Sequence, residues 1–424
     1  MKRYSIRISI ALLTILLIPV SAFSNGYTSP WLGGELSGPG VANGAGVYWN
    51  PAAIGAIKGN SIFFTLEPTY EYVSYQRYGV NQNGSPYNRV SFNDWAPLPT
   101  FAATFELPKN FGFGLGIYAP FARIANYPSN GPERFNGISE TLAIVNITPA
   151  LTYKITPALI IGAGISYVYG SLDVHESTTL DTVNPSDENP LYEAKVHLKN
   201  NTGSTYGWNA GIYYHPTHNF TAGLSYMART YYTLEGNADI TISPQMASLI
   251  GSSQFTAKSQ LSFSMPQMVA LGIHFEPTPS WIVDITEQWI NWSIYKTIHI
   301  KLYDASNVLA NREENMLTGF EDTLSSKIWT GYKGFKKWLI AAGATYDPSG
   351  IPLNHIYALN LEFNKIELFA EANYDITKSS TIGIGFDHNI TQDANVTESV
   401  IQPSSNGLYK ADIEKITLLY NYKF

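Results

Sequence analysis

The sequence contains no cysteine. It can therefore form no disulfide, and it offers no N-terminal cysteine for lipid modification. It contains a single long apolar run, residues 8–20, which is shorter than the roughly 20 residues that a membrane-spanning helix needs. Charged residues are also scarce, at 14% of the chain, and the formal net charge of -7 comes with no basic patch. These absences exclude a helical membrane protein and argue against nucleic-acid binding.

The first 24 residues resemble a secretory signal peptide. They combine the basic start Lys2-Arg3, the apolar run and the small-residue exit Ala22-Phe23-Ser24. We expect cleavage before Asn25, with the bond between Ala22 and Phe23 as the second choice. A retained N-terminal anchor helix is the alternative interpretation. An exported chain without disulfides or lipid must depend on its own fold or on a membrane for stability.

Aromatic residues and glycine are abundant, at 14% of the chain and 34 residues respectively. Apolar and polar residues also alternate with period two, which is typical of strands with one apolar face. The last residues show this alternation, with the apolar set Ile416, Leu418, Tyr420, Tyr422 and Phe424 on one face. A membrane-like composition without a spanning helix leaves two classes, a closed β-barrel or a large soluble β-protein.

Short and long connections alternate along the chain. Six tight connections are rich in turn-forming residues and fall at residues 108–110, 156–158, 216–219, 277–280, 334–336 and 377–379. Longer polar stretches lie between them, at residues 176–204, 237–255, 303–323 and 392–407. One end of the sheet therefore has short turns and the other has long loops. This asymmetry is typical of outer-membrane barrels, with the turns in the periplasm and the loops outside.

The turn count predicts the number of strands. If both chain ends lie on the periplasmic side, six periplasmic turns separate seven hairpins, so we predict an all-β protein with a fourteen-stranded antiparallel transmembrane β-barrel. Residues 356–376 fit either one long strand or a loop followed by a strand, and the count assumes the latter. A soluble β-propeller or β-sandwich is the alternative, but neither requires a terminal aromatic strand or this loop asymmetry.

The region before the first strand has a different character. We expect that strand to begin near Ser61, which leaves residues 25–59 outside the wall. This region is rich in glycine and aromatics and includes the uncharged stretch GAGVYWNPAAI. We place it inside the barrel as a plug, because a fourteen-stranded lumen is too wide for wall side chains to fill. The alternative, a disordered periplasmic tail, would leave Trp31 and Trp49 in water. The expected domains are a signal peptide (1–24), a plug (25–59) and a barrel (60–424).

The element Asn50-Pro51-Ala52 resembles the Asn-Pro-Ala element in the N-terminal plug, or hatch, of the FadL/TodX family of outer-membrane transporters for hydrophobic compounds. Residues 111–121, 207–230 and 265–293 resemble further family segments in the same order. The resemblance implies a fourteen-stranded barrel in the outer membrane of a Gram-negative bacterium, with the plug closing its lumen. It also implies passive uptake of hydrocarbons, lipids or long-chain fatty acids, with no reaction catalysed.

In that family the ligand enters from outside, occupies an apolar pocket above the plug and leaves sideways through a wall gap beside a kink in strand three. The candidate kink residues here are Gly112, Gly114, Gly116 and Pro120. Alternate glycines permit a kink and close approach by the plug, and proline cannot donate to the ladder. The plainer interpretation is that glycine fits a tight wall.

Asn50, Pro51 and Ala52 are the candidate gate. Proline fixes φ and asparagine bonds nearby backbone, so the pair makes a stiff turn. We expect this turn to lie against strand three, where a small shift connects the pocket to the wall gap. An ordinary turn in a static plug is the alternative.

The candidate ligand pocket comprises Trp49, Tyr118, Phe320 and Glu321. Family members that bind fatty acids place basic groups near the carboxylate, one of them in a Gly-Phe-Lys-Asp stretch. The corresponding stretch here is GFED, residues 319–322, and an acidic side chain in that place would repel a carboxylate. The second basic position falls near residues 169–171, which include no arginine or lysine; Lys327 or Arg312 are alternative basic groups. We therefore expect neutral hydrocarbons or weakly polar lipids in preference to fatty acids.

No catalytic, metal or cofactor site is predicted, because the serine-hydrolase, zinc-protease and phosphate-loop motifs are absent. His215 and His218 flank a turn and are interpreted as solvated residues. A barrel-borne lipid hydrolase and a general diffusion porin are the alternative functions. The expected partners are outer-membrane lipids, lipopolysaccharide and the insertion machinery that reads a last strand ending in Phe424. The protein is expected to be a monomer.

Overall fold

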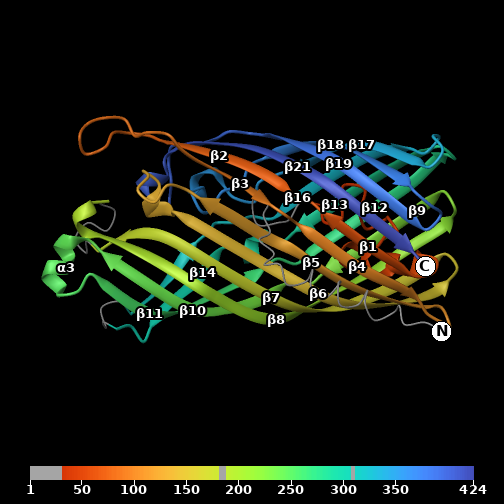
Figure 1. Cartoon of the computed structure of the whole chain (residues 1–424), viewed down its shortest axis with the longest axis horizontal. Helices are drawn as coiled ribbons and strands as arrows, with labels where there is room; N and C mark the ends of the chain where they lie inside the picture. The colour runs from red at the N-terminus through yellow and green to blue at the C-terminus, as the bar shows by residue number, and fades with distance from the viewer. Residues whose placement is uncertain (1–30, 181–187, 307–310) are drawn as a thin grey trace.

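A computed structural model describes residues 31–180, 188–306 and 311–424. The expected signal peptide, residues 1–24, and the first six residues of the expected plug lie outside the described residues. Within the described part, the chain forms one closed antiparallel sheet (Figure 1). In the same part, no helix is both long and apolar enough to cross a membrane.

The barrel has fourteen strand positions among the described residues, as predicted. Eight positions hold one continuous strand and six hold two consecutive segments. In chain order they are β1 (Ser61–Leu66) with β2 (Thr69–Arg77), β3 (Val90–Ala96) with β4 (Pro99–Glu106), β5 (Phe111–Asn126), β6 (Ser139–Thr156), β7 (Leu159–Thr179), β8 (Glu193–Thr217), β9 (Phe220–Met227) with β10 (Thr230–Ile242), β11 (Gln254–Met265) with β12 (Met268–Thr278), β13 (Trp281–Ile290) with β14 (Thr297–Tyr303), β15 (Arg312–Leu317) with β16 (Thr323–Tyr332), β17 (Trp338–Asp347), β18 (Lys365–Asp375), β19 (Ser380–Thr391) and β21 (Gly407–Lys423).

Short elements complete the described chain. The strand β20 (Ala394–Val396) pairs with β21. The helical elements are α2 (Gly46–Trp49), η1 (Pro51–Ala56), η2 (Arg134–Asn136), η3 (Pro190–Tyr192), α3 (Pro244–Ile250), η4 (Trp292–Ile294), η6 (Leu353–His355) and η7 (Pro403–Ser405).

The first and last strands close the barrel. Ser61 of β1 pairs with Lys423, and Thr69 of β2 pairs with Lys415, both on β21. The six short connections predicted from sequence all join consecutive strand positions. They lie at the end of the barrel that holds the C-terminus, whereas α3 lies at the opposite end (Figure 1). We call these the short-turn end and the long-loop end.

The side-chain pattern of the strands is that of a membrane barrel. On β18, Ile366 and Leu368 are 45% and 46% exposed on the outer face, while the alternating Glu367 and Glu371 are buried. A soluble sheet would bury the apolar face, so this inverted pattern decides between the two classes that composition left open. Residues 356–363 are buried and do not continue the strand, which begins at Lys365, as the strand count assumed.

The two largest apolar clusters of the described residues lie in the lumen. One surrounds the N-terminal residues and includes Trp31, Trp49 and Tyr118. The other occupies the half toward the long-loop end and includes Phe121 and Phe320. The candidate site described below lies where these two clusters meet.

Candidate transport path: N-terminal segment, lumen and wall seams

Residues 31–59, here called the N-terminal segment, lie inside the barrel. Between residues 31 and 57 Ala42 is the one exposed residue. The segment contacts strands around the whole wall, from β5 through β12 to β16 and β21. Its sequence GVYW forms the short helix α2 and PAAIGA forms η1, and the two helices meet at Asn50.

Asn50 fixes that junction through its side chain. Its Oδ1 accepts a hydrogen bond from the Ala52 N–H at 3.1 Å, and Pro51 occupies the first position of η1, an arrangement that favours helix initiation. Its Nδ2 donates to the carbonyls of Pro39 and of Ile212 on β8, each at 2.9 Å. The turn is therefore tied both to the segment and to the wall.

The wall residues that face this turn are glycines. A Cβ placed on Gly211 of β8 would lie 2.0 Å from Asn50 Oδ1, and one on Gly162 of β7 would lie 2.5 Å from the Ala52 nitrogen. No side chain fits at either position without moving the segment. The turn thus lies against β7 and β8, and not against strand three as expected from the sequence.

Strand three, β5, contacts the segment through other residues. A Cβ on Gly114 would lie 2.6 Å from Ile54 Cδ1, and one on Gly116 would lie 2.8 Å from Val47 Cγ1. A Cβ on Gly112 would instead meet Thr152 of β6 at 2.7 Å. Because Gly114 and Gly116 have no side chains, the segment packs directly on the backbone of β5. Ile54 contacts Gly114, and Val47 contacts Gly116.

β5 departs from regular pairing near Pro120. Its register with β6 shifts between Tyr118 and Phe121, which is a bulge that bends a strand. On its other edge β5 pairs with β4 only as far as Ile117, and β3 pairs with β2 alone. Among the described residues, no ladder pair joins β3 to β5, and we call this discontinuity the β3–β5 seam.

Small buried side chains fill the β3–β5 seam. Leu98, Ala119 and Ala122 pack together there, each at most 2% exposed. Toward the long-loop end, the rings of Phe92 and Tyr127 meet at 4.8 Å. Side-chain packing is therefore present at this part of the wall, where no described ladder pair joins β3 to β5.

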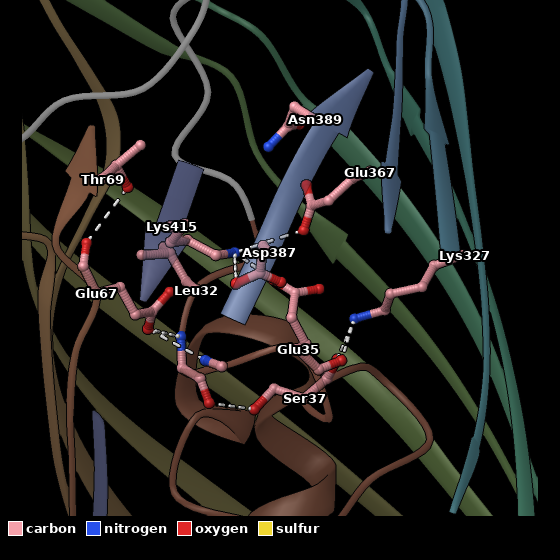
Figure 2. A network of polar contacts seen from close by, with 12 residues as sticks. Leu32, Glu35, Ser37, Glu67, Thr69, Lys327, Glu367, Asp387, Asn389 and Lys415 are labelled. Carbon is pink, nitrogen blue, oxygen red and sulfur yellow. Dashed lines mark hydrogen bonds and ion pairs between the residues drawn. The ribbon is translucent and has the colours of Figure 1, made fainter. Parts of the chain in front are cut away.

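The opposite side of the N-terminal segment meets the wall through charge (Figure 2). The Lys415 ammonium on β21 forms an ion pair with Glu35 of the segment and lies 3.6 Å from the Glu367 carboxylate and 3.7 Å from that of Asp387. All four side chains are at most 1% exposed. Oxygens of the three acids lie within 4.8 Å of one another, a spacing that suits a metal ion, but the Lys415 ammonium already supplies a cation there.

Two further wall residues hold the segment. Lys327 of β16 donates to the carbonyls of Glu35 and Ser37, at 2.8 and 2.9 Å, and lies 3.9 Å from the ring of Trp31. Glu67, between β1 and β2, accepts from the N–H groups of Gly33 and Gly34 at 3.0 and 3.1 Å. These buried charges bond directly to the backbone of the segment.

Glu35 has an altered acidity. Its burial, and then the neighbouring Glu367 carboxylate, raise the pKa of Glu35 to about 8 from its ordinary value of 4.5. Lys415 and Lys327 oppose this shift. Burial prevails because the attraction of the two ammonium groups does not make up for the hydration that the carboxylate loses.

The predicted pocket residues separate into two places. Trp49 and Tyr118 lie together, since both rings contact Tyr48, at 5.0 and 5.2 Å. Tyr118 also shares a hydrogen bond of 2.9 Å with Thr148 of β6. Both residues belong to the cluster around the N-terminal segment.

Phe320 lies in the other cluster. It contacts Trp292 at 4.9 Å, and Trp292 in turn contacts Phe121 of the β5 bulge at 5.9 Å. Glu321 is exposed and does not line this pocket, because the chain turns outward directly after Phe320. The expectation that Glu321 faces the ligand is therefore not met.

Two apolar cavities lie between this aromatic cluster and the long-loop end. The larger, about 130 Å³, is lined by β7, β8, β10, β11 and β14, and Arg312 is its one charged lining residue among those described. The smaller, about 30 Å³, has Glu140 and Glu176 among otherwise apolar lining residues. Sequence reasoning named Arg312 as an alternative basic group but did not identify either cavity.

The buried charges were also missed. A signal for them exists, because Glu367, Asp387 and Lys415 occupy strand faces opposite a continuous apolar face. In a membrane barrel such residues must point into the lumen. Their partner Glu35 lies in a region without periodicity, so the ion pair itself leaves no pattern in the sequence.

Comparison with known proteins identifies the family to which this barrel belongs. The profile of the family described as outer membrane protein transport protein (OMPP1/FadL/TodX) matches residues 24–424. The long-chain fatty acid transport protein of Escherichia coli O6:H1 is 22% identical over 417 residues, which cover 91% of each chain. Outer membrane protein P1 of Haemophilus influenzae is 21% identical over 304 residues, or 66% of this chain and 64% of that one.

Solved structures share the fold. A FadL homologue from Pseudomonas aeruginosa gives a TM-score of 0.82 at 16% identity and covers 94% of this chain and 100% of that one. The toluene transporter TodX from P. putida gives 0.71 at 17% identity, covering 96% and 99%. The family resemblance carried by Asn50-Pro51-Ala52 is thereby confirmed. The chain belongs to the OMPP1/FadL/TodX family of transport proteins and is a transporter of the Gram-negative outer membrane, not an enzyme.

Proposed function

We propose that this protein passively takes up hydrophobic small molecules, and that neutral hydrocarbons or weakly polar lipids are preferred to fatty acids. The observation that carries this proposal is the β3–β5 seam, where no ladder pair joins the two strands among the described residues and Leu98, Ala119 and Ala122 pack together in the wall. Relatives with this fold include proteins named as fatty acid transporters and toluene transporters. Both groups of substrates are hydrophobic.

The proposed path begins at the apolar cavity near the long-loop end, which faces the outside in this orientation. It continues past the aromatic cluster of Phe121, Trp292 and Phe320 and ends at the β3–β5 seam. The cavity and the cluster on this path are apolar, so a hydrophobic molecule would bury its surface there. Release into the bilayer is favourable for the same reason, since apolar surface is not returned to water.

The charges of the lumen support a neutral ligand. Lys327 and Lys415 both bond to the N-terminal segment, so neither offers a free ammonium to a carboxylate. Arg312 lies 2.7 Å from Glu314. The described lining of the smaller cavity includes no lysine or arginine, and Arg123 is paired with its lining residue Glu140 at 3.5 Å, so a carboxylate ligand would find no unpaired cation there.

The N-terminal segment acts in this proposal as a plug, and the chain divides into a signal peptide (1–24), plug (25–59) and barrel (60–424). Asn50, Pro51 and Ala52 hold the plug against β7 and β8, while Val47 and Ile54 transmit its position to strand three. Outer-membrane lipids and lipopolysaccharide surround the monomer, and the last strand ending in Phe424 directs its insertion.

Uptake in whole cells tests the function. Cells producing the protein should accumulate radiolabelled toluene faster than cells with the empty vector, and the gain should be smaller for oleate. Ala122→Trp, which fills the seam, should lower toluene uptake at unchanged surface abundance. Toluene uptake equal to that of the empty vector would refute the proposal, and a larger gain for oleate would refute the ligand preference.

Asn50→Ala tests the gate. It removes one capping and two tethering hydrogen bonds, which together contribute about 1–3 kcal/mol. We expect a changed uptake rate together with more frequent ion conductance in planar bilayers. Asn83→Ala, in an exposed loop, is the control. If both variants match the wild type at normal abundance, the turn has no gating role.

A further inference from the structure

The wall has a second discontinuity, between β8 and β10. β8 pairs with β9 as far as Asn209, and its pairing with β10 begins again only at Thr202. Residues 203–208 have no ladder pair on that edge, where the Trp208 carbonyl accepts a hydrogen bond from the Ala228 N–H at 2.9 Å, although on the other edge they pair continuously with β7. Thr230 to Leu234 of β10 likewise pair with β11 on their far side. We call this the β8–β10 seam.

Glycines let β10 overlap the lumenal face of β8. A Cβ on Gly203 would lie 2.2 Å from the Thr233 carbonyl oxygen, and one on Gly207 would lie 3.0 Å from Thr230 Cγ2. Side chains at these two positions would force the strands apart. Close packing is therefore present at this seam, as it is at the β3–β5 seam.

The side chains of Tyr232 and Leu234 cover the seam from inside. Leu234 Cδ2 lies 3.1 Å, and Tyr232 Cδ1 3.5 Å, from where a Cβ on Gly170 of β7 would stand. Tyr232 is 2% exposed, and its ring contacts Phe263 of the main lumenal cluster at 5.4 Å. The seam therefore borders the same apolar lumen as the first one.

A small cavity of about 10 Å³ lies at this place. Its lining runs from Phe121, in the β5 bulge, to Trp208, which is 50% exposed on the outer face. Asn146 also lines it, and its buried Oδ1 has no hydrogen-bond partner. On the outside, Tyr206 and Tyr231 flank the seam at 75% and 60% exposure. Aromatic side chains of this kind occupy the membrane interface.

We propose that the β8–β10 seam is a second lateral passage, through which a neutral hydrophobic molecule leaves the lumen for the bilayer when the Tyr232 side chain moves. Unpaired backbone groups are costly in lipid, and such groups persist where they are buried or line a cavity. The β8–β10 seam meets this condition, because its backbone is covered by Tyr232 and Leu234 and lines a small cavity. The glycines on β8 carry no side chain that would block a movement of β10. The inference rests on the proposed uptake function and adds a second exit to it.

A disulfide across the seam tests the proposal. Gly207→Cys with Thr230→Cys places the two Cβ atoms at most about 4.5 Å apart, because Thr230 Cγ2 is one bond from its Cβ, and this distance suits a disulfide. The natural chain has no cysteine, so no other pairing competes. Tyr214→Cys with Ala222→Cys, opposite each other on the paired part of β8 and β9, is the matched control.

Uptake of radiolabelled toluene is then measured in the Ala122→Trp background, which fills the first seam. We expect Ala122→Trp alone to retain a measurable part of the uptake. The oxidised Gly207–Thr230 lock should reduce that part to the empty-vector level, dithiothreitol should restore it, and the control lock should leave it unchanged. If Ala122→Trp alone already abolishes uptake, or the oxidised lock has no effect, the second passage is refuted. Wild-type uptake at the empty-vector level would instead refute the proposed function.

Tyr232→Ala supplies an independent measurement that requires no disulfide. It should raise toluene uptake severalfold over the Ala122→Trp parent, because it uncovers the seam. Tyr409→Ala removes a buried tyrosine of the same lumenal cluster from β21, where both strand edges are paired, and should not raise uptake. Equal uptake in the two variants would overturn the assignment of Tyr232 as the cover of the seam.

Discussion

The two sides of the N-terminal segment meet the wall in different ways. Toward β5, β7 and β8 the contacts are close approaches to glycine, such as that of Ala52 to Gly162, together with uncharged hydrogen bonds from Asn50 to Ile212 and from Asn209 to Val47. Toward β16 and β21 they are buried ion pairs and hydrogen bonds, such as those of Lys327 and Lys415 with Glu35. Glycine contacts are short-ranged and have no bonding direction, whereas charged hydrogen bonds fix both distance and angle.

This difference assigns separate tasks to the two sides. The charged side holds the segment in place, because a displaced ammonium would leave several carboxylates unpaired in a dry site. The glycine side borders both wall seams, since β5 carries one and β8 the other. A small movement there changes packing without breaking an ion pair. The charged side thus holds the N-terminal segment in place. On the glycine side, a small movement of the segment changes its packing against the strands that border the two seams.

The largest effect is expected from Lys415→Met. It leaves Glu35, Glu367 and Asp387 buried without their shared cation, at a cost of about 3–5 kcal/mol. The segment should undock, which would appear as frequent ion conductance in planar bilayers and a lower unfolding temperature.

Lys410→Met is the matched control on the same strand. Lys410 pairs with Asp393 at 2.5 Å, but both side chains are about half exposed, so the loss should stay below about 1 kcal/mol. Equal conductance in the two variants at equal surface abundance would contradict the holding role of the charged side.

A smaller effect is expected from Gly162→Val on the glycine side. The new Cβ would stand 2.5 Å from the backbone nitrogen of Ala52, and such overpacking costs about 1–3 kcal/mol. The unfolding temperature should fall less than in Lys415→Met. Ala163→Val, whose side chain faces outward on the same strand, should leave both unfolding and conductance unchanged. A larger effect of the control would show that the strand itself, and not its contact with the segment, is sensitive.

The sequence predicted the barrel well because its signals are local. The alternation in residues 416–424 and the six short turns depend only on neighbouring residues, and they were sufficient for the strand count. Asn50-Pro51-Ala52 likewise forms a capped helix start within three residues. Local patterns specify local structure, whatever surrounds them.

The site depends instead on contacts across long stretches of chain. Lys415 meets Glu35 after 380 residues, and neither residue type is unusual at its position. The outward turn of Glu321 follows from the break between β15 and β16, which sequence patterns did not reveal. Both seams are missing pairs between strands, and unpaired edges have the same alternation as paired ones.

The smallest effect is expected from pH, which should alter how firmly the charged side holds the N-terminal segment. The pKa of Glu35 is about 8, raised mainly by burial, whereas its ordinary value is 4.5. Its neighbours are Glu367, Asp387, Lys415 and Lys327. A carboxyl with a raised pKa binds its proton more tightly in the folded protein. The stability it contributes is therefore complete below pH 4.5 and is lost as the pH rises through about 8.

Docking of the segment should accordingly weaken as the pH rises from about 5 to about 8 and change little above that, with more frequent ion conductance at the higher pH. Glu35→Gln keeps the shape of the side chain and removes the titration, so its conductance should not change over this range. Glu321→Gln, at an exposed acid, should keep the wild-type response. A pH step that survives in Glu35→Gln would assign the titration to another group and leave the ion pair of Glu35 with Lys415 as a support that is insensitive to pH.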